Sequence, residues 1–214
     1  MLRAAPLFRS ESHERLAGRS EHGVRGQDNR CQIQPRPAGI AVKDTVELHL
    51  REAAAGDEPA IRAVVFAVLR EYGLQPDPAD TDSDLQDVVS SYTKRGGCFR
   101  VLCSPANEIV GCGGLYPLDA QEAEIRKMYL LPRARGRGFG RALLHDLVER
   151  ARAQGFRRVV LETASVLREA IGLYRRHGFE PLCRDHLASR CDQAYVLELA
   201  SEKSLTGSLP GSTV

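Results

Sequence analysis

The chain has 214 residues, of which 43% are apolar and 27% are charged, a composition that suits one ordinary folded domain with some chain to spare. No stretch approaches the roughly 20 apolar residues of a membrane span, so no membrane partner is expected. The formal net charge is +2, but residues 1–44 hold eight Lys and Arg against five Asp and Glu, a surplus of three that leaves the remainder at −1. A main body without basic excess does not predict a nucleic-acid surface.

The N-terminal segment, residues 1–44, lacks apolar periodicity and is rich in Arg, Ser, Gly, Gln and Pro, which predicts a disordered extension. Its acidic residues argue against a mitochondrial transit peptide, and it has no apolar segment of the secretory kind. A Ser- and Gly-rich tail is expected to be loose at residues 201–214. The folded domain is therefore predicted at residues 45–200.

Six cysteines are spread along the chain without a CxxC pair or a metal-ligand spacing, and four of them fall in strand-like runs. We therefore expect reduced thiols, a cytoplasmic location and no metal.

The first elements of the domain follow from alternation and helical spacing. Residues 46–50 alternate and predict a strand. A helix is expected next, with Asp57 as its N-cap, Pro59 in its first turn and Gly73 at its end. Its apolar face is formed by Ile61, Val64, Val65, Val68, Leu69 and Tyr72. Residues 82–93 carry a weaker helical pattern and predict a second helix.

The later elements are predicted in the same way. Strands are expected at residues 98–103, 108–116, 123–131, 157–161, 179–183 and 192–199, and helices at residues 138–153 and 166–177. Gly155 and Gly178 follow the ends of the two helices. The order β-α-α-β-β-β-α-β-α-β-β indicates an α+β fold with a mixed sheet.

The most informative segment is the loop Arg-Gly-Arg-Gly-Phe-Gly-Arg at residues 135–141, between a predicted strand and a predicted helix. Glycines let the backbone approach a ligand, and a helix start offers unpaired N–H groups and a positive dipole end. With Arg133, the loop brings four arginines within nine residues, which suits a pyrophosphate. The spacing fits neither G-x-G-x-x-G nor G-x-x-x-x-G-K-[ST], but it does fit R-x-x-G-x-G.

This loop resembles the coenzyme A loop of the GNAT superfamily of N-acetyltransferases. Residues 123–132 resemble the family's preceding strand, residues 161–163 the end of its next strand, and residues 173–179 its late helix ending in Gly-Phe. The resemblance is close over residues 123–182 and extends in outline over about 46–200. It implies the GNAT fold, in which a mixed central sheet with splayed parallel strands is flanked by helices, as in single-domain bacterial members.

The resemblance also implies acetyl-CoA as co-substrate and a set of residues that bind it. The cofactor's pantetheine arm would run along the strand before the loop, and the loop would bind its pyrophosphate. The implied residues are Met128, Tyr129, Leu130, Leu131, Arg135, Gly136, Arg137, Gly138, Phe139, Gly140, Arg141 and Thr163. Thr163 stands where many relatives have Asn after the second core strand, and its hydroxyl can make a similar hydrogen bond.

Tyr174 is the candidate proton donor. It lies on the apolar face of the late helix, at the place of the family's donor tyrosine, and a phenol can protonate a leaving thiolate. The alternative is a core aromatic with a satisfied hydroxyl. Glu124 occupies the position where many relatives carry a carboxylate that accepts a proton through water, although it can also be read as an exposed strand-end residue. Glu162 is a second candidate base.

Three further reactive side chains are given no role in catalysis or in metal binding. His145 and His177 lie at polar or terminal helix positions and are expected to face solvent. Cys191 has no evident His partner and is expected to be a small buried residue.

The resulting hypothesis is an acetyl-CoA-dependent N-acetyltransferase that acts by direct attack of a primary amine in a ternary complex. One alternative is a catalytically inactive module that binds CoA, and another is a nucleic-acid-binding protein that uses the arginine cluster. The acceptor, a small molecule or a peptide amine, cannot be identified from the sequence. A homodimer is a further hypothesis for the assembly of the protein.

Overall fold

The computed structural model describes residues 47–199, so the extensions predicted at residues 1–44 and 201–214 lie outside the described residues. The strands are β1 (His49–Glu52), β2 (Cys98–Cys103), β3 (Ile109–Pro117), β4 (Glu122–Leu130), β5 (Arg158–Thr163), β6 (Glu180–Leu182) and β7 (Gln193–Glu198). The helices are α1 (Glu58–Glu71), α2 (Val88–Ser91), α3 (Phe139–Ala153) and α4 (Arg168–Arg176). No helix within residues 47–199 is long and apolar enough to cross a membrane.

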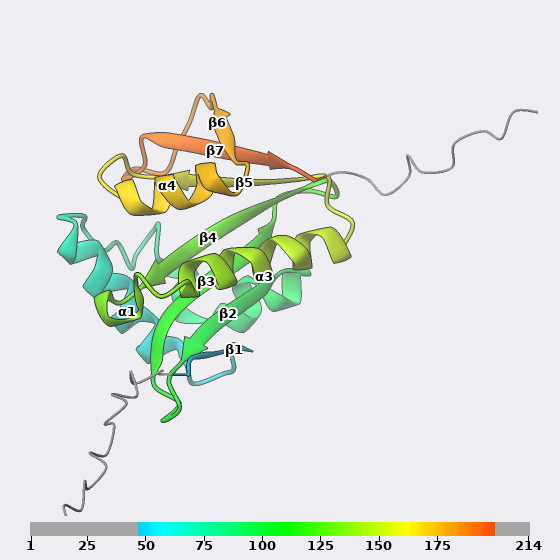
Figure 1. Cartoon of the computed structure of the whole chain (residues 1–214). Helices are drawn as coiled ribbons and strands as arrows, with labels where there is room; N and C mark the ends of the chain where they lie inside the picture. Colours follow the sequence, from blue (N-terminus) through cyan, green and yellow to red (C-terminus); the bar gives the residue numbers. More distant parts are fainter. Residues whose placement is uncertain (1–46, 200–214) are drawn as a thin grey trace, which may run out of the picture. The chain divides into compact units, whose positions relative to one another are not determined.

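The strands form one mixed sheet in the order β1-β2-β3-β4-β5-β7-β6 (Figure 1). Each neighbouring pair is antiparallel except β4 and β5, which run parallel. Their pairing extends only from Glu122 opposite Arg158 to Ile125 opposite Leu161. Beyond Ile125, the described part of the chain has no backbone pairing between β4 and β5, and the two strands separate toward their C-terminal ends. The predicted splay of parallel strands is therefore present.

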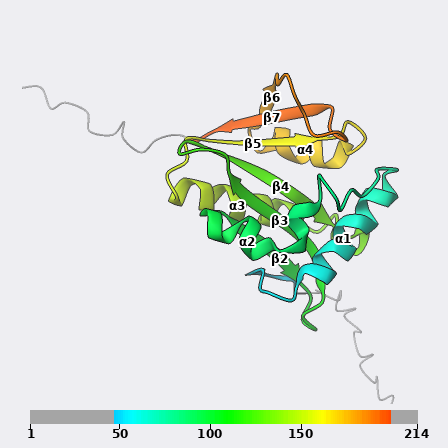
Figure 2. The same ribbon diagram turned by 180° about the vertical axis from the view of Figure 1, so that it is seen from behind.

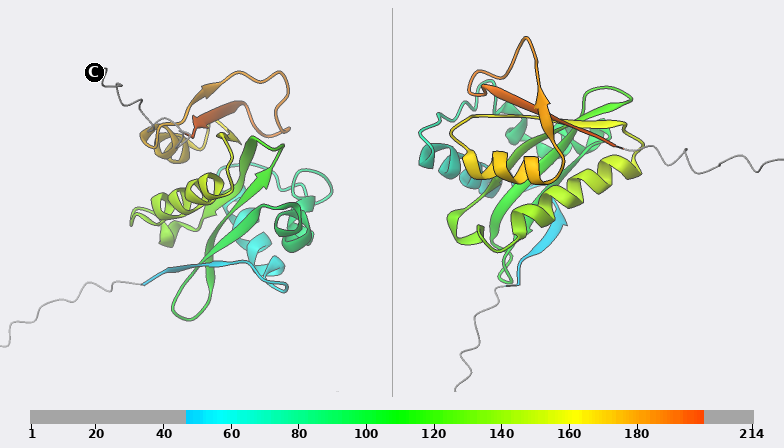
Figure 3. Two further views of the ribbon diagram at one scale, coloured as in Figure 1. Left: turned by 90° about the vertical axis from the view of Figure 1, so that its right-hand side faces the viewer. Right: turned by 45° about the horizontal axis from the view of Figure 1, so that its top comes forward.

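Helices cover both faces of the sheet. α1 and α2 lie on one face, which is turned toward the viewer in Figure 2, and α3 and α4 lie on the other, side by side in the right-hand view of Figure 3. Leu143, Leu144 and Leu147 of α3 are fully buried in one apolar cluster, and Ile61 and Leu69 of α1 are fully buried in a second. Each such side chain contributes about 1.5–3 kcal/mol to stability. The apolar face predicted for α1 is confirmed except at Tyr72, which is the C-cap of the helix and is half-buried.

The start of the domain differs from the prediction in two details. The first strand, expected at residues 46–50, lies at His49–Glu52, because its pairing with β2 begins with His49 opposite Cys103. Asp57 precedes α1, but its side chain makes no capping bond to the helix. Its carboxylate instead accepts a hydrogen bond from Arg51 at 2.6 Å. Arg51 binds both oxygens of this carboxylate, and one of them also accepts from the N–H of Ala54, so these partners outside the helix replace the capping bond.

The second helix, predicted at residues 82–93, is broken. A 3₁₀ turn at Ser83–Gln86 precedes α2. Between them Asp87 is extended, with φ −148°, and its carboxylate accepts a hydrogen bond from the backbone N–H of Ser90 at 2.8 Å. This side chain caps a new helix instead of continuing the old one.

A backbone irregularity in β4 lies between the half that pairs with β5 and the half that pairs with β3 alone. Lys127 has φ +54°, and the register between β3 and β4 shifts between Cys112 and Gly114. A left-handed conformation costs a non-glycine residue about 1–2 kcal/mol. The Nζ of Lys127 lies 2.7 Å from Oδ1 of Asp82, a fully buried carboxylate that also binds Arg190. This buried ion cluster holds the strained residue two positions after the β4–β5 pairing ends.

Candidate active site

A cleft of about 810 Å³ opens where β4 and β5 separate. It is lined by the end of α1, the second half of β4, the loop before α3, the end of β5 and one face of α4. Among the residues that line it are ten of the predicted site: Met128, Tyr129, Leu130, Arg135, Gly136, Gly138, Gly140, Arg141, Thr163 and Tyr174. The structure therefore brings together predicted site residues that lie up to 46 positions apart in the sequence. Four other predicted site residues do not line the cleft: Glu124, Leu131, Arg137 and Phe139.

The glycine loop has a backbone that only glycine adopts without strain. Gly136 has φ +71° and Gly138 has φ +84°, and a Cβ atom built on either would meet no other atom within 4 Å. The positions therefore need glycine for their backbone conformation, and the space beside them is open. Gly138 is the N-cap of α3 and supplies no side chain to the helix's first N–H groups. These groups are available to an anion in the cleft.

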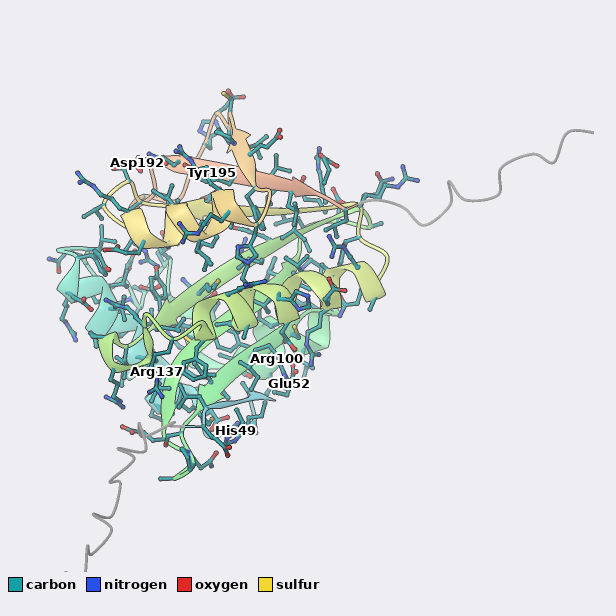
Figure 4. The ribbon with its side chains drawn as sticks, viewed as in Figure 1. His49, Glu52, Arg100, Arg137, Asp192 and Tyr195 are labelled. Carbon is teal, nitrogen blue, oxygen red and sulfur yellow. The ribbon has the colours of Figure 1, made fainter. Side chains whose placement is uncertain are left out.

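The four arginines of the loop have different surroundings. Arg133 pairs with Glu108 at 2.6 Å on the exposed β2–β3 hairpin. Arg135 donates a hydrogen bond to the carbonyl of Leu130 at 2.9 Å and forms an ion pair with Glu71, the last residue of α1. Arg137, at the start of α3 in Figure 4, lies over the ring of Phe139 at 5.4 Å. Arg141 is exposed, lines the cleft and makes no ion pair within residues 47–199. Its charge is therefore available to a ligand.

Two predicted binding residues pack into the protein instead of lining the cleft. Leu131 contacts the apolar cluster beneath α1, and Phe139 contacts the small cluster of Leu102, Val110 and Ala134. Their side chains fix the two ends of the loop segment. Thr163, at the end of β5, is buried, and its carbonyl accepts a hydrogen bond from the N–H of Asp192 at 3.1 Å.

Tyr174 points inward from α4, as its position on the apolar face predicts. The residue is only 6% exposed, and its ring packs against Phe179 with centroids 5.9 Å apart. Its hydroxyl makes no hydrogen bond to any residue within 47–199. Burial raises the pKa of this phenol well above its usual value, so it stays protonated at neutral pH. Burial likewise raises the pKa of Tyr129, which lines the same cleft, to about 12.

The two candidate bases lie in different surroundings. Glu124 is 7% exposed and pairs with Arg126 at 2.6 Å, so it is not the exposed strand-end residue that was the alternative. Burial raises the pKa of its carboxyl, although Arg126 opposes the shift. Glu162 lines the cleft, and its Oε2 accepts a hydrogen bond from the N–H of Ala188 at 2.8 Å. Glu162 therefore has direct access to the cleft, whereas Glu124 is outside the residues that line it.

A family model described as "Acetyltransferase (GNAT) family" matches residues 65–179, more than half of the chain. The matched segment contains the glycine loop, the separated half of β4 and Tyr174. The chain belongs to the GNAT acetyltransferase family. The fold and the family are therefore the ones implied by the four segments that resemble GNAT proteins, at residues 123–132, 135–141, 161–163 and 173–179.

Relatives and solved structures agree with this assignment. The N-acetyltransferase YjgM of Escherichia coli is 40% identical over 160 residues, which span 70% of this chain and 94% of that protein. An acetyltransferase of the GNAT family from Staphylococcus aureus superposes with a TM-score of 0.68 at 20% identity, covering 72% of this chain and all of that one. A phosphinothricin acetyltransferase from Sinorhizobium meliloti, solved in complex with AcCoA, gives 0.58 at 24% identity over 77% and 94%. The protein is accordingly an acyltransferase of the N-acetyltransferase class.

The same cleft also contains two side chains for which the sequence predicts other surroundings. His177 is half-buried and lines the cleft, and its Nδ1 lies 2.8 Å from the carbonyl of Leu173. The ring is therefore only partly exposed to solvent, and it faces a cleft that the sequence did not predict for it. The position of His177 three residues after Tyr174, on the same helix face, was the available signal. Cys191 is half-buried in the cleft wall instead of the core. His145 faces solvent as expected.

Proposed function

We propose that the protein transfers an acetyl group from acetyl-CoA to a primary amine by direct attack within a ternary complex. The observation that carries this proposal is that one cleft is lined both by the glycine loop and by Tyr174 and Glu162. A pyrophosphate suits the open backbone of Gly136 and Gly138 and the cation of Arg141. The reacting groups of the two substrates would meet where the cleft passes between β4 and β5.

The separated half of β4 suits the amide-bearing arm of CoA. From Arg126 to Leu130 the strand has no β5 partner within the described residues, so the edge that faces the cleft can hydrogen-bond to an extended ligand. A chain with alternating amide groups can bind such an edge as an added strand does. Main-chain recognition of this kind needs no particular side chains, which fits the mixed character of residues 128–130.

The chemistry needs a neutral amine, an attacked thioester and a protonated leaving group. The amine nitrogen attacks the thioester carbonyl carbon, the C–N bond forms, and the C–S bond breaks as its electron pair passes to sulfur. We propose that Tyr174 protonates that sulfur and that Glu124 accepts the amine's proton through water. Burial raises the pKa of Cys191 to about 11, which keeps its thiol neutral and disfavours a covalent acetyl-enzyme.

Acetyl-CoA should raise the melting temperature of the purified protein, whereas NAD and ATP should not. A ligand that binds the native state stabilises it by mass action, by about 2.7 kcal/mol at 100 times its dissociation constant. Differential scanning fluorimetry measures the shift, and a screen of amines with free-thiol detection then separates an enzyme from an inactive CoA-binding module. No shift at millimolar acetyl-CoA in a folded protein would contradict the donor assignment. The acceptor and the cytoplasmic location stay predictions.

The pH profile should identify the base. The active form of Glu124 is its carboxylate, so kcat/KM should rise as the pH climbs through a pKa above the ordinary 4.5. Glu124→Gln should lower kcat/KM by about 10²-fold and abolish this acid limb. Glu162→Gln is the comparison, since its carboxylate lines the cleft. If the limb disappears in Glu162→Gln and persists in Glu124→Gln, Glu162 is the base instead.

A further inference from the structure

We infer that the last turn of α1 closes the acetyl-CoA cleft at its mouth, with Tyr72 as the positioning residue. This inference rests on the proposed function, since it concerns how the same cleft holds its donor. Four side chains form a continuous bridge across the mouth: Glu71, Arg135, Tyr72 and Glu169. We call them the α1 bridge.

The α1 bridge is continuous through one guanidinium and one hydroxyl. Arg135 donates two hydrogen bonds to the carboxylate of Glu71, at 2.6 and 2.8 Å. Its Nη1 also donates to the hydroxyl of Tyr72 at 3.4 Å, and its guanidinium lies 5.4 Å from the centre of the Tyr72 ring. The Tyr72 hydroxyl in turn donates to Oε2 of Glu169 at 3.2 Å. The hydroxyl thus joins a cation on one side to an anion on the other.

The α1 bridge joins the segments that follow β4 and β5, beyond the point where the pairing of these two strands ends. Arg135 follows β4, whereas Glu169 lies in the first turn of α4, which follows β5. Tyr72 is the C-cap of α1. Figure 1 shows the end of α1, the loop before α3 and the start of α4 on the side where β4 and β5 are apart. The β4–β5 pairing stops at Ile125, and the side chains of the α1 bridge link the two segments beyond this point.

The bridge is part of the wall that a ligand would touch. Tyr72, Arg135 and Glu169 all line the cleft. The side chains of Arg135 and Glu71 are 28% and 38% exposed, so water reaches the contacts and they can open and re-form. A donor bound between the glycine loop and Tyr174 would lie in the cleft that these contacts close. We therefore expect the α1 bridge to slow the release of acetyl-CoA.

Loss of the Tyr72–Glu169 hydrogen bond should speed dissociation. Tyr72→Phe keeps the ring over Arg135 and removes only the hydroxyl, and Glu169→Gln removes the charge that it binds. With acetyl-CoA as the probe and the full-length protein immobilised, surface plasmon resonance should show each variant raising koff about tenfold, which corresponds to about 1.4 kcal/mol. The double variant should be no faster than either single variant, because both act through one bond.

A matched carboxylate provides the control. Glu108 pairs with Arg133 of the same loop, but this pair lies on the exposed hairpin and lines no part of the cleft. Glu108→Gln should leave koff unchanged. An unchanged koff in folded Tyr72→Phe overturns the inference, and so does a raised kon with unchanged koff, which would make the bridge a barrier to entry. Wild-type protein that binds no acetyl-CoA would instead overturn the proposed function.

Discussion

Gly138→Asp should reduce acetyl-CoA affinity by roughly 100-fold or more. The substitution places a carboxylate in the open space beside a loop that is proposed to bind a pyrophosphate, and juxtaposed like charges cost several kcal/mol. The apo protein should still fold, because the new Cβ meets no atom within 4 Å and the positive φ costs a non-glycine residue only about 1–2 kcal/mol. The measurement is the dissociation constant by calorimetry, with the melting temperature recorded beside it.

Gly155→Asp is the matched control for this substitution. Gly155 follows the other end of α3, has the same φ of +84°, also has no atom within 4 Å of a built Cβ, and does not line the cleft. The two variants add the same strain and the same charge, so only the position differs. Equal acetyl-CoA affinities in the two folded variants would remove the loop from the donor site.

Tyr174→Phe should lower kcat by about 10²–10⁴ while acetyl-CoA affinity stays nearly unchanged. The hydroxyl matters only as the C–S bond breaks and charge builds on sulfur. It makes no hydrogen bond within residues 47–199, so its removal leaves no polar group unpaired. The ring and its contact with Phe179 remain, and the melting temperature should therefore change little. Steady-state kinetics with an amine from the screen measures the effect.

Two other tyrosines make this experiment specific. Tyr195, labelled in Figure 4, is buried in the same apolar cluster, and its hydroxyl binds Gln193 and Arg175 outside the cleft. Tyr195→Phe should cost stability and spare kcat, which is the opposite pattern. Tyr129→Phe tests the other phenol that lines the cleft. A large loss of kcat in Tyr129→Phe with near wild-type rates in Tyr174→Phe would transfer the donor role to Tyr129.

The sequence predicts those parts of the fold whose signals are local. The apolar faces of α1 and α3 recur at helical spacing, and Gly73, Gly155 and Gly178 mark helix ends at positive φ. The broken helix at residues 82–93 was missed because Asp82 and Asp87 act through other partners. Asp82 binds Lys127, 45 residues away, and Asp87 caps a new turn. A charged residue that is bound far along the chain leaves no local pattern.

The site residues show the same difference between local signals and contacts made far along the chain. The loop, Thr163 and Tyr174 could be placed because each belongs to a motif with its own spacing. Glu124 was located in the sequence, but its burial and its pairing with Arg126 depend on the packed sheet. The engagement of Arg135 by Glu71, 64 residues earlier, could not be inferred from the loop alone. Side-chain partners across long separations are set by tertiary packing, which periodicity does not encode.

The short parallel junction also has a consequence for how the chain folds. β2, β3 and β4 are consecutive antiparallel strands, so short loops bring them together. β5 can join them only after the chain has passed through the whole crossover helix α3. Closure of such a long loop costs more entropy than closure of a hairpin, and the strand pairing that it makes possible between β4 and β5 comprises only four residue pairs. We therefore expect an assembled antiparallel meander to form first, and the segment from β5 to β7 to dock on it as a late step.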